Sequence, residues 1–204
     1  RDVATMMLLY KSYVRSHLEY CCPLWSPHMQ CEIIKLEAVQ RSFTAKIQGL
    51  GNLNYWERLR RLSMYSLQRR RERYTIILVW KIYNNLAPNS MNINFRETSR
   101  YGTTCIRPLG SSKYTSVNNL RFNSFASRAS ALYNVVPPAI KSLLTLTTFK
   151  PALDAFLNEF LTLHQHLGTL EEQELNAGVG RWHVSLTRYY MAVEMQDILG
   201  LVAL

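Results

Sequence analysis

The sequence predicts a mainly α-helical fold, in which a helical bundle is followed by a long polar loop region and two further helices. Three observations support this class. Apolar residues recur every three or four positions over most of the chain, and residues that start or stop helices separate these runs. The composition is 48% apolar and 19% charged, which is enough apolar material for a folded core.

The first helix is expected over residues 3–18, where the apolar stripe consists of Val3, Met6, Met7, Tyr10, Val14 and Leu18. Pro23 and Pro27 then predict a turn that presents Trp25. A second helix is expected from about Glu32 to Gln48, with one apolar face and two glycines just after its end. The face consists of Ile33, Leu36, Phe43 and Ile47, and the glycines are Gly49 and Gly51.

Asn54, followed three residues later by Glu57, predicts the start of a short helix that buries Tyr55, Leu59 and Leu62. A longer helix is expected from Leu67 to about Leu86, with a core stripe of Ile76, Val79, Tyr83 and Leu86. Ile77, Leu78 and Trp80 make this helix apolar nearly all round, so it should lie deep in the fold.

Residues 88–119 are rich in Pro, Gly, Ser, Thr and Asn and predict a long loop region, with a short strand at Thr104–Leu109. Helical periodicity returns with Phe122, Phe125, Ala129, Leu132 and Val136, and Pro137–Pro138 end that helix. The last predicted helix has Thr147 or Thr148 as its cap and Pro151 in its first turn. Its stripe consists of Phe149, Leu153, Phe156, Phe160 and Leu163.

The net charge of +10 is distributed unevenly. Residues 1–150 contain 22 basic and 7 acidic side chains, whereas residues 151–204 contain 2 and 7. A basic body with an acidic tail favours binding of a polyanion by the body. Charge alone leaves open the alternative of a basic domain that binds nothing in particular.

No apolar run approaches the ~18 residues of a membrane span, and no signal segment is present, so we expect an intracellular protein without membrane contacts. The chain opens at Arg1 rather than Met, which suggests a fragment of a longer protein. The cysteines are expected to be free thiols in a reducing compartment; they are Cys21, Cys22, Cys31 and Cys105. The set of Cys21, Cys22, His28 and Cys31 matches no common zinc spacing, so buried thiols are favoured over a metal site.

No catalytic residues and no cofactor are predicted. Metal-assisted phosphoryl transfer requires clustered carboxylates, but no two of Asp2, Asp154 and Asp197 neighbour each other. The acidic group Glu171, Glu172 and Glu174 indicates a solvated helix start, and His164 and His166 lack the acidic partner of a zinc-protease helix. A phosphate-cradling glycine loop and a Gly-x-Ser-x-Gly elbow are both missing.

Arginine density is the most distinctive feature. Residues 57–73 contain Arg58, Arg60, Arg61, Arg69, Arg70, Arg71 and Arg73. The last four occupy early turns of a predicted helix, where the dipole disfavours each by about 0.3–1 kcal/mol. A phosphate would offset this cost, because helix amides and arginines can bind one anion together. Arg41, Lys46 and Lys81 are expected to contribute from outside the cluster.

Helical geometry limits this patch, since Arg69 and Arg73 share a face whereas Arg70 lies about 100° round and Arg71 is nearly opposite. A merely solvated basic face is therefore the alternative. Nearby aromatic side chains could stack on bases, although aromatics at helical spacing are more often part of a core. These are Trp56, Tyr65 and Tyr74.

Five segments carry a recognisable pattern: LYKSYVRSHLEYCCPLWSP at 9–27, KLEAVQRSFTAKIQGL at 35–50, YWERLRRLSMYSLQRRRERY at 55–74, FASRASALYNVVPPAI at 125–140 and TFKPALDAFL at 148–157. In this order and spacing they resemble the region that follows the polymerase core in reverse transcriptases of non-long-terminal-repeat (LINE-type, jockey-like) retrotransposons. Departures from the family pattern are Ser16 in place of a proline, Tyr133 in place of a tryptophan and Val136 in place of a leucine.

The resemblance covers residues 1 to about 160. It implies a thumb-like helical region at 1–87 and a C-terminal helical region at 120–160. The polar loop region at 88–119 lies between them, and residues 161–204, which do not match the family, form a divergent acidic tail. The Asp-Asp strand that carries catalysis in these enzymes, and would use Mg²⁺, lies upstream of this region and is absent from the chain. The resemblance also implies RNA or DNA backbone and the missing polymerase core as partners, and a location in cytoplasm or nucleus.

The leading hypothesis is a non-catalytic C-terminal fragment of an RNA-directed DNA polymerase that binds RNA or DNA backbone without sequence preference. Replacing Arg69, Arg70 and Arg73 by Ala is expected to flatten the salt dependence of binding. One alternative is a helical protein–protein interaction module that uses exposed parts of the Ile76–Trp80 stripe or of the final Phe stripe. The other alternative is an inactive, decayed copy of the element.

Overall fold

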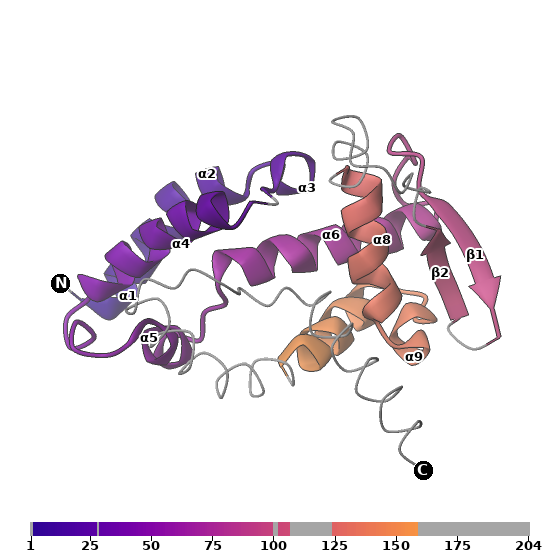
Figure 1. The fold of residues 1–204 in the computed structure, drawn as a ribbon. Coiled ribbons are helices and arrows are strands. Elements are labelled where there is room, and N and C mark those ends of the chain that lie inside the picture. Colours follow the sequence, from indigo (N-terminus) through magenta and orange to yellow (C-terminus); the bar gives the residue numbers. More distant parts are fainter. Residues whose placement is uncertain (1, 28, 100–101, 107–123, 159–204) are drawn as a thin grey trace, which may run out of the picture. The chain divides into compact units, whose positions relative to one another are not determined.

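The computed structural model describes residues 2–27, 29–99, 102–106 and 124–158, and it confirms the mainly α-helical class (Figure 1). The chain divides into two compact units, which we call unit 1 (Arg1–Thr75) and unit 2 (Ile76–Leu204). The boundary falls inside helix α6 and does not coincide with the division expected at residue 87. The expected tail at 161–204 lies outside the described residues.

Unit 1 begins with an unbroken helical run over the expected residues 3–18, made of α1 (Val3–Leu9), the π-helical segment η1 (Tyr10–Val14) and α2 (Arg15–Glu19). The Asp2 carboxylate caps the run by accepting the N–H of Thr5 at 3.0 Å. The N–H of Arg15 donates to the carbonyl oxygen of Tyr10, five residues back, which is the bond that defines the π segment.

The segment after α2 is a short helix, α3 (Cys22–Trp25), rather than the turn predicted from its prolines. Pro23 is tolerated because it stands in the first turn, where no backbone N–H is needed. Cys21 precedes the helix with a left-handed backbone, at φ 49°. Trp25 is exposed, as predicted.

Helix α4 (Gln30–Ala45) starts and ends slightly before the predicted limits, and Gly49 adopts a φ of +79° in the turns that follow it. Helix α5 (Tyr55–Arg61) begins as predicted, because the side chain of Asn54 accepts the N–H of Glu57 at 2.8 Å. It ends in a Schellman motif at Ser63, whose φ is +49°. The N–H groups of Ser63 and Met64 donate to the carbonyls of Arg60 and Leu59.

The core of unit 1 joins these helices. The rings of Tyr10 and Phe43 stack with centroids 4.7 Å apart, so η1 lies beside α4, as Figure 1 shows. The buried members are Met7, Tyr10, Ile47, Leu50, Tyr55, Leu59 and Met64.

Helix α6 (Leu67–Tyr83) brings the chain into unit 2. Ile76, Val79 and Trp80 are completely buried, which confirms the prediction of a deep helix. The predicted core residue Leu86 is 61% exposed, because α6 has already ended in a second Schellman motif. Asn85 has a φ of +57°, and the N–H groups of Asn85 and Leu86 donate to the carbonyls of Ile82 and Lys81.

A β-hairpin occupies part of the region expected to be a loop. Strands β1 (Asn94–Thr98) and β2 (Gly102–Ile106) pair antiparallel, with Phe95 opposite Cys105. The single strand predicted at Thr104–Leu109 is therefore the second of two, and it starts earlier; residues 107–109 lie outside the described part.

Three helices complete unit 2: α8 (Phe125–Val135), α9 (Pro138–Lys141) and a helix over 146–158. The last helix is capped by Thr145 rather than Thr147 or Thr148, since Thr145 Oγ1 accepts the N–H of Thr148 at 3.3 Å. The predicted stripe residues Phe122, Phe160 and Leu163 lie outside the described residues. The buried core includes Ile76, Val79, Trp80, Ala129, Leu132, Val136, Phe149, Leu153 and Leu157.

Candidate nucleic-acid interface

The exposed surface of unit 1 is more basic than its composition suggests. Among its described residues the exposed acidic side chains are Asp2 and Glu32. Its other carboxylates are buried or half-buried, and Glu19 pairs with arginine. The exposed basic side chains are Lys11, Lys35, Arg41, Lys46, Arg60 and Arg61. Arg41, Lys46, Arg60 and Arg61 are among the nucleic-acid-binding residues predicted from the sequence, whereas Lys11 and Lys35 are not.

Arg58 is buried, with 6% exposure, and holds α5 against α4. Its Nη1 donates to the carbonyl oxygen of Leu53 at 2.9 Å, and its Nη2 donates to that of Arg41 at 3.4 Å. Its guanidinium also lies 5.9 Å from the centre of the Tyr55 ring. These donors point into the fold, so the structure does not place Arg58 among the exposed charges of unit 1.

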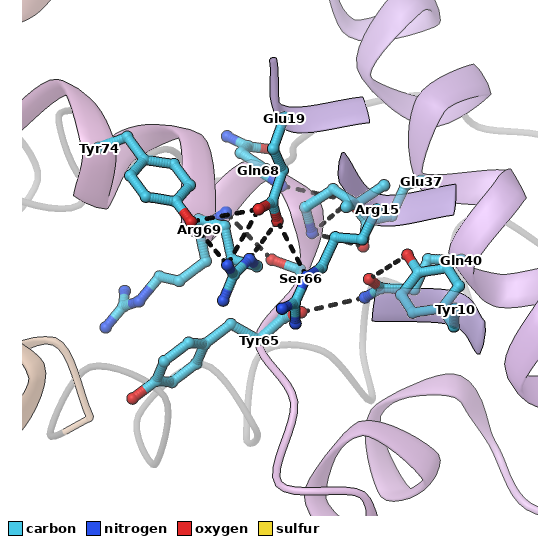
Figure 2. A network of polar contacts seen from close by, with 12 residues as sticks. Tyr10, Arg15, Glu19, Glu37, Gln40, Tyr65, Ser66, Gln68, Arg69 and Tyr74 are labelled. Carbon is cyan, nitrogen blue, oxygen red and sulfur yellow. Dashed lines mark hydrogen bonds and ion pairs between the residues drawn. The ribbon is translucent and has the colours of Figure 1, made fainter. Parts of the chain in front are cut away.

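Arg70 is paired with a carboxylate from a distant segment. Its Nε and Nη2 both donate to Glu19, with 3.0 Å between Nη2 and Oε2, and Nη2 also lies 2.7 Å from the hydroxyl oxygen of Tyr74. Figure 2 shows Glu19 between Tyr74 and Arg15, and Arg15 Nε lies 3.8 Å from Glu19 Oε1. Burial lowers the pKa of Arg70, but the hydrogen bond and the charge of Glu19 outweigh it, so the net shift is upward.

Arg69 and Arg71 are also buried, at 6% and 3% exposure, and Arg73 is half-buried. In the part of the chain that the structure describes, Nη1 and Nη2 of Arg71 have no hydrogen-bond partner. Burial lowers the pKa of Arg71, and the charge of Glu37 partly offsets that effect. The structure therefore does not present Arg69 to Arg73 as one exposed cluster: Arg69 and Arg71 are buried, Arg70 is paired with Glu19, and Arg73 is half-buried.

Glu37 occupies the helix end at which a phosphate was expected. Its Oε1 and Oε2 each lie 3.1 Å from the N–H of Leu67, and Oε2 accepts the N–H of Gln68 at 3.3 Å. The hydroxyl of Tyr55 donates to the same carboxylate. A buried carboxylate at a helix N-terminus satisfies free amides and the helix dipole, so an anion from solution has no place there.

Sequence reasoning missed Glu37 and its neighbour Gln40, although a signal was present. Gln40 Nε2 lies 3.0 Å from the Tyr55 hydroxyl oxygen. It also lies 3.0 Å from the Tyr65 carbonyl oxygen (Figure 2). Positions 33, 37, 40, 44 and 47 follow the helical period, and all five are buried. Two long polar side chains on the buried face of a helix predict an internal hydrogen-bond network.

The aromatic side chains named from the sequence do not form an open stacking platform, because Trp56, Tyr65 and Tyr74 are all half-buried. Lys81, in unit 2, is half-buried as well. The apolar stripe proposed as a protein-binding surface is inside the core of unit 2: Ile76, Ile77, Val79 and Trp80 are buried, and Leu78 is half-buried.

The cysteines are free, but only two of them are buried as expected. Burial raises the pKa of Cys22 to about 11 and that of Cys105 to about 12, so both are inert thiols at neutral pH. Cys21 and Cys31 are exposed. The described side chains include no group of three or more His, Cys, Asp and Glu that could hold a metal ion, and His28 lies outside them.

None of the described helices has the length and apolar character needed to cross a membrane. Comparisons with protein-family models, with curated proteins and with solved structures give no match to this chain.

Proposed function

We propose that unit 1 binds the sugar–phosphate backbone of RNA or DNA without sequence preference, as a non-catalytic C-terminal part of a retrotransposon reverse transcriptase. The excess of exposed basic over exposed acidic side chains on unit 1 is the observation that carries the proposal. The link to reverse transcriptases rests on the five ordered sequence segments quoted above.

The proposed contacts are Arg41, Lys46, Arg60 and Arg61, which are all exposed and belong to α4, its C-cap and α5. The buried Arg58 of α5 donates to the Arg41 carbonyl oxygen of α4, so the two helices are held together. The positions of their exposed basic residues are therefore fixed relative to each other. The guanidinium of Arg41 lies 4.9 Å from the centre of the Tyr55 ring, which orients it without neutralising its charge. Arginine is suited to this role because its planar fork can bind two phosphate oxygens at once.

The test is the salt dependence of binding by the double variant R60A/R61A. On duplex DNA the logarithm of the association constant falls by about 0.9 per phosphate neutralised for each tenfold rise in salt. Loss of two phosphate contacts is therefore expected to reduce this slope by about 2 and to weaken binding at low salt. Titration of a labelled oligonucleotide at several salt concentrations measures both quantities.

The matched control is R96A/K150A, which removes the same charge from exposed positions of unit 2. If both double variants change the slope equally, binding reflects net charge and the assignment of contacts to Arg60 and Arg61 is wrong. If the unaltered protein binds no nucleic acid at low salt, the proposed function itself is wrong.

A further inference from the structure

We infer that unit 1 takes single-stranded nucleic acid, whose unpaired bases stack on Tyr13, Tyr20 and Trp25. This inference rests on the backbone binding proposed above and adds a class of substrate to it. The three side chains are 70%, 76% and 41% exposed. Each therefore presents ring surface to solvent, unlike the half-buried Trp56, Tyr65 and Tyr74.

The two tyrosines lie on one face of the first helical run. Tyr13 lies near the end of the π segment and Tyr20 is the C-cap of α2; positions 13, 16 and 20 are separated by three and four residues, and all three are exposed. Tyr13 and Tyr20 are about two helical turns apart, or about 10 Å along the axis. This spacing gives each ring room for a base of its own.

Trp25 follows Tyr20 closely in space as well as in sequence, because its Nε1 donates to the Tyr20 carbonyl oxygen at 2.6 Å. This bond fixes the indole and uses its one polar hydrogen. What the side chain still offers to a ligand is therefore the flat face of its ring. Base–aromatic stacking needs only that face, and it tolerates any base sequence.

The charges around these rings fit a phosphate backbone. Lys11 and His17 are exposed on the same helical run. The carboxylate of Glu19 is only 11% exposed and is bound to Arg70 and Arg15. No described acidic residue between 3 and 27 is exposed, so a polyanion along this run would meet no repelling carboxylate.

The experiment compares the variant Y13L/Y20L with Y13F/Y20F on a labelled oligo(dT) single strand and on a duplex of the same length. Leucine keeps an apolar side chain but removes the π face, whereas phenylalanine keeps the ring. We expect Y13L/Y20L to lose about 25-fold in affinity for the single strand, about fivefold per ring, and to bind the duplex normally. Y13F/Y20F is expected to bind both as the unaltered protein does.

A third variant, W25L, is expected to lose a further factor of about five on the single strand alone. Circular dichroism of each variant verifies that the helices are intact. Unchanged single-strand affinity in the leucine variants, or an equal loss on the duplex, would overturn the inference while leaving backbone binding in place. A complete failure to bind either oligonucleotide would overturn both.

Light scattering distinguishes a protein contact from a base-stacking surface. If the unaltered protein self-associates, and Y13A/Y20A abolishes this while Y13L/Y20L preserves it, then the face is an apolar contact between copies of the chain. That result, together with unchanged single-strand affinity, would also overturn the inference.

Discussion

The hydroxyl oxygen of Tyr10 lies 2.7 Å from Oε1 of Gln40, and this buried hydrogen bond joins segments that are thirty residues apart. Burial raises the pKa of Tyr10, and the nearby charge of Glu37 raises it further, so the phenol stays a donor at every physiological pH. Gln40 Nε2 donates to the Tyr55 hydroxyl oxygen, and the Tyr55 hydroxyl donates to the Glu37 carboxylate. The first helical run, α4, α5 and the start of α6 are thus linked by one polar network.

Replacing Tyr10 by Phe is expected to lower the free energy of unfolding by about 1–2 kcal/mol, because Oε1 of Gln40 loses its donor while it stays buried. Urea denaturation measures the loss. Tyr13→Phe is the matched control on the same helical run, and since that hydroxyl is exposed its effect should stay within about 0.5 kcal/mol. Equal effects of the two changes would contradict this role for Tyr10.

Replacing Glu37 by Gln is expected to destabilise the protein by about 1–3 kcal/mol. The amide nitrogen would face backbone N–H groups of Leu67 or Gln68, which are donors, and the negative charge at the start of α6 would be lost. Glu32→Gln, an exposed position in the first turn of the same helix, serves as the control. Thermal unfolding at one pH compares the two variants directly.

Arg70→Ala is expected to cost stability rather than binding. The variant would leave Glu19 without its two-point partner, at a cost of about 1–3 kcal/mol, while the salt dependence of nucleic-acid binding stays unchanged. R60A/R61A should show the opposite pattern, with normal unfolding and a reduced slope. If the folded Arg70→Ala variant shows a weaker salt dependence of nucleic-acid binding, Arg70 is a binding residue and this prediction is wrong.

Lys141 gives unit 2 a pH-dependent stability. It is 3% exposed, its Nζ donates to the Asn134 carbonyl oxygen at 3.2 Å, and burial lowers its pKa from 10.5 to about 8. Between pH 8 and 10.5 the unfolded chain binds more protons at this site than the folded chain, so this residue makes stability rise with pH. The full cost, at most about 3 kcal/mol, is present below pH 8.

Lys141→Met should therefore be more stable than the unaltered protein at pH 7, and the difference should shrink as the pH approaches 10. Cys105 and Tyr133 lie nearby, but their pKa values are raised by burial, and both remain in the two proteins, so the comparison cancels most of their effect. Chemical denaturation at pH 7, 8, 9 and 10 measures the difference. A constant difference across this range would contradict the assignment to Lys141.

The sequence was sufficient to predict most of the helices, because their apolar periodicity is a local property. The Asn54 cap and the buried stripe from Ile76 to Trp80 were predicted for this reason. The end of α6 was harder, since Leu86 continues the period and only the left-handed Asn85 stops it. The hairpin was missed in part because strands as polar as Asn94–Thr98 carry little alternation.

The candidate site was predicted less well, because residues far away in sequence decide whether an arginine side chain is buried and paired or faces solvent. Nothing near Arg70 reveals that Glu19 is its partner, and nothing near Arg58 reveals the carbonyl of Arg41. A count of basic residues cannot distinguish side chains that hold the fold together from side chains that face solvent. Arg60 and Arg61 stay exposed although Arg58 and Leu59, directly before them, are buried, and only the orientation of α5 determines this difference.

The π segment at Tyr10–Val14 makes chain length, and not only side-chain type, a constraint on the first helical run. A π turn is closed by a hydrogen bond between residues five apart, so it holds one residue more than an α-helical turn. Deleting one residue there would restore ordinary α-helical bonding. Because the wide turn absorbs the extra residue, this deletion would leave the earlier side chains on their present faces, with Met7 in the core. A one-residue deletion inside α2 has no wide turn to absorb it, so it would turn the earlier side chains by about 100° and move Met7 out of the core.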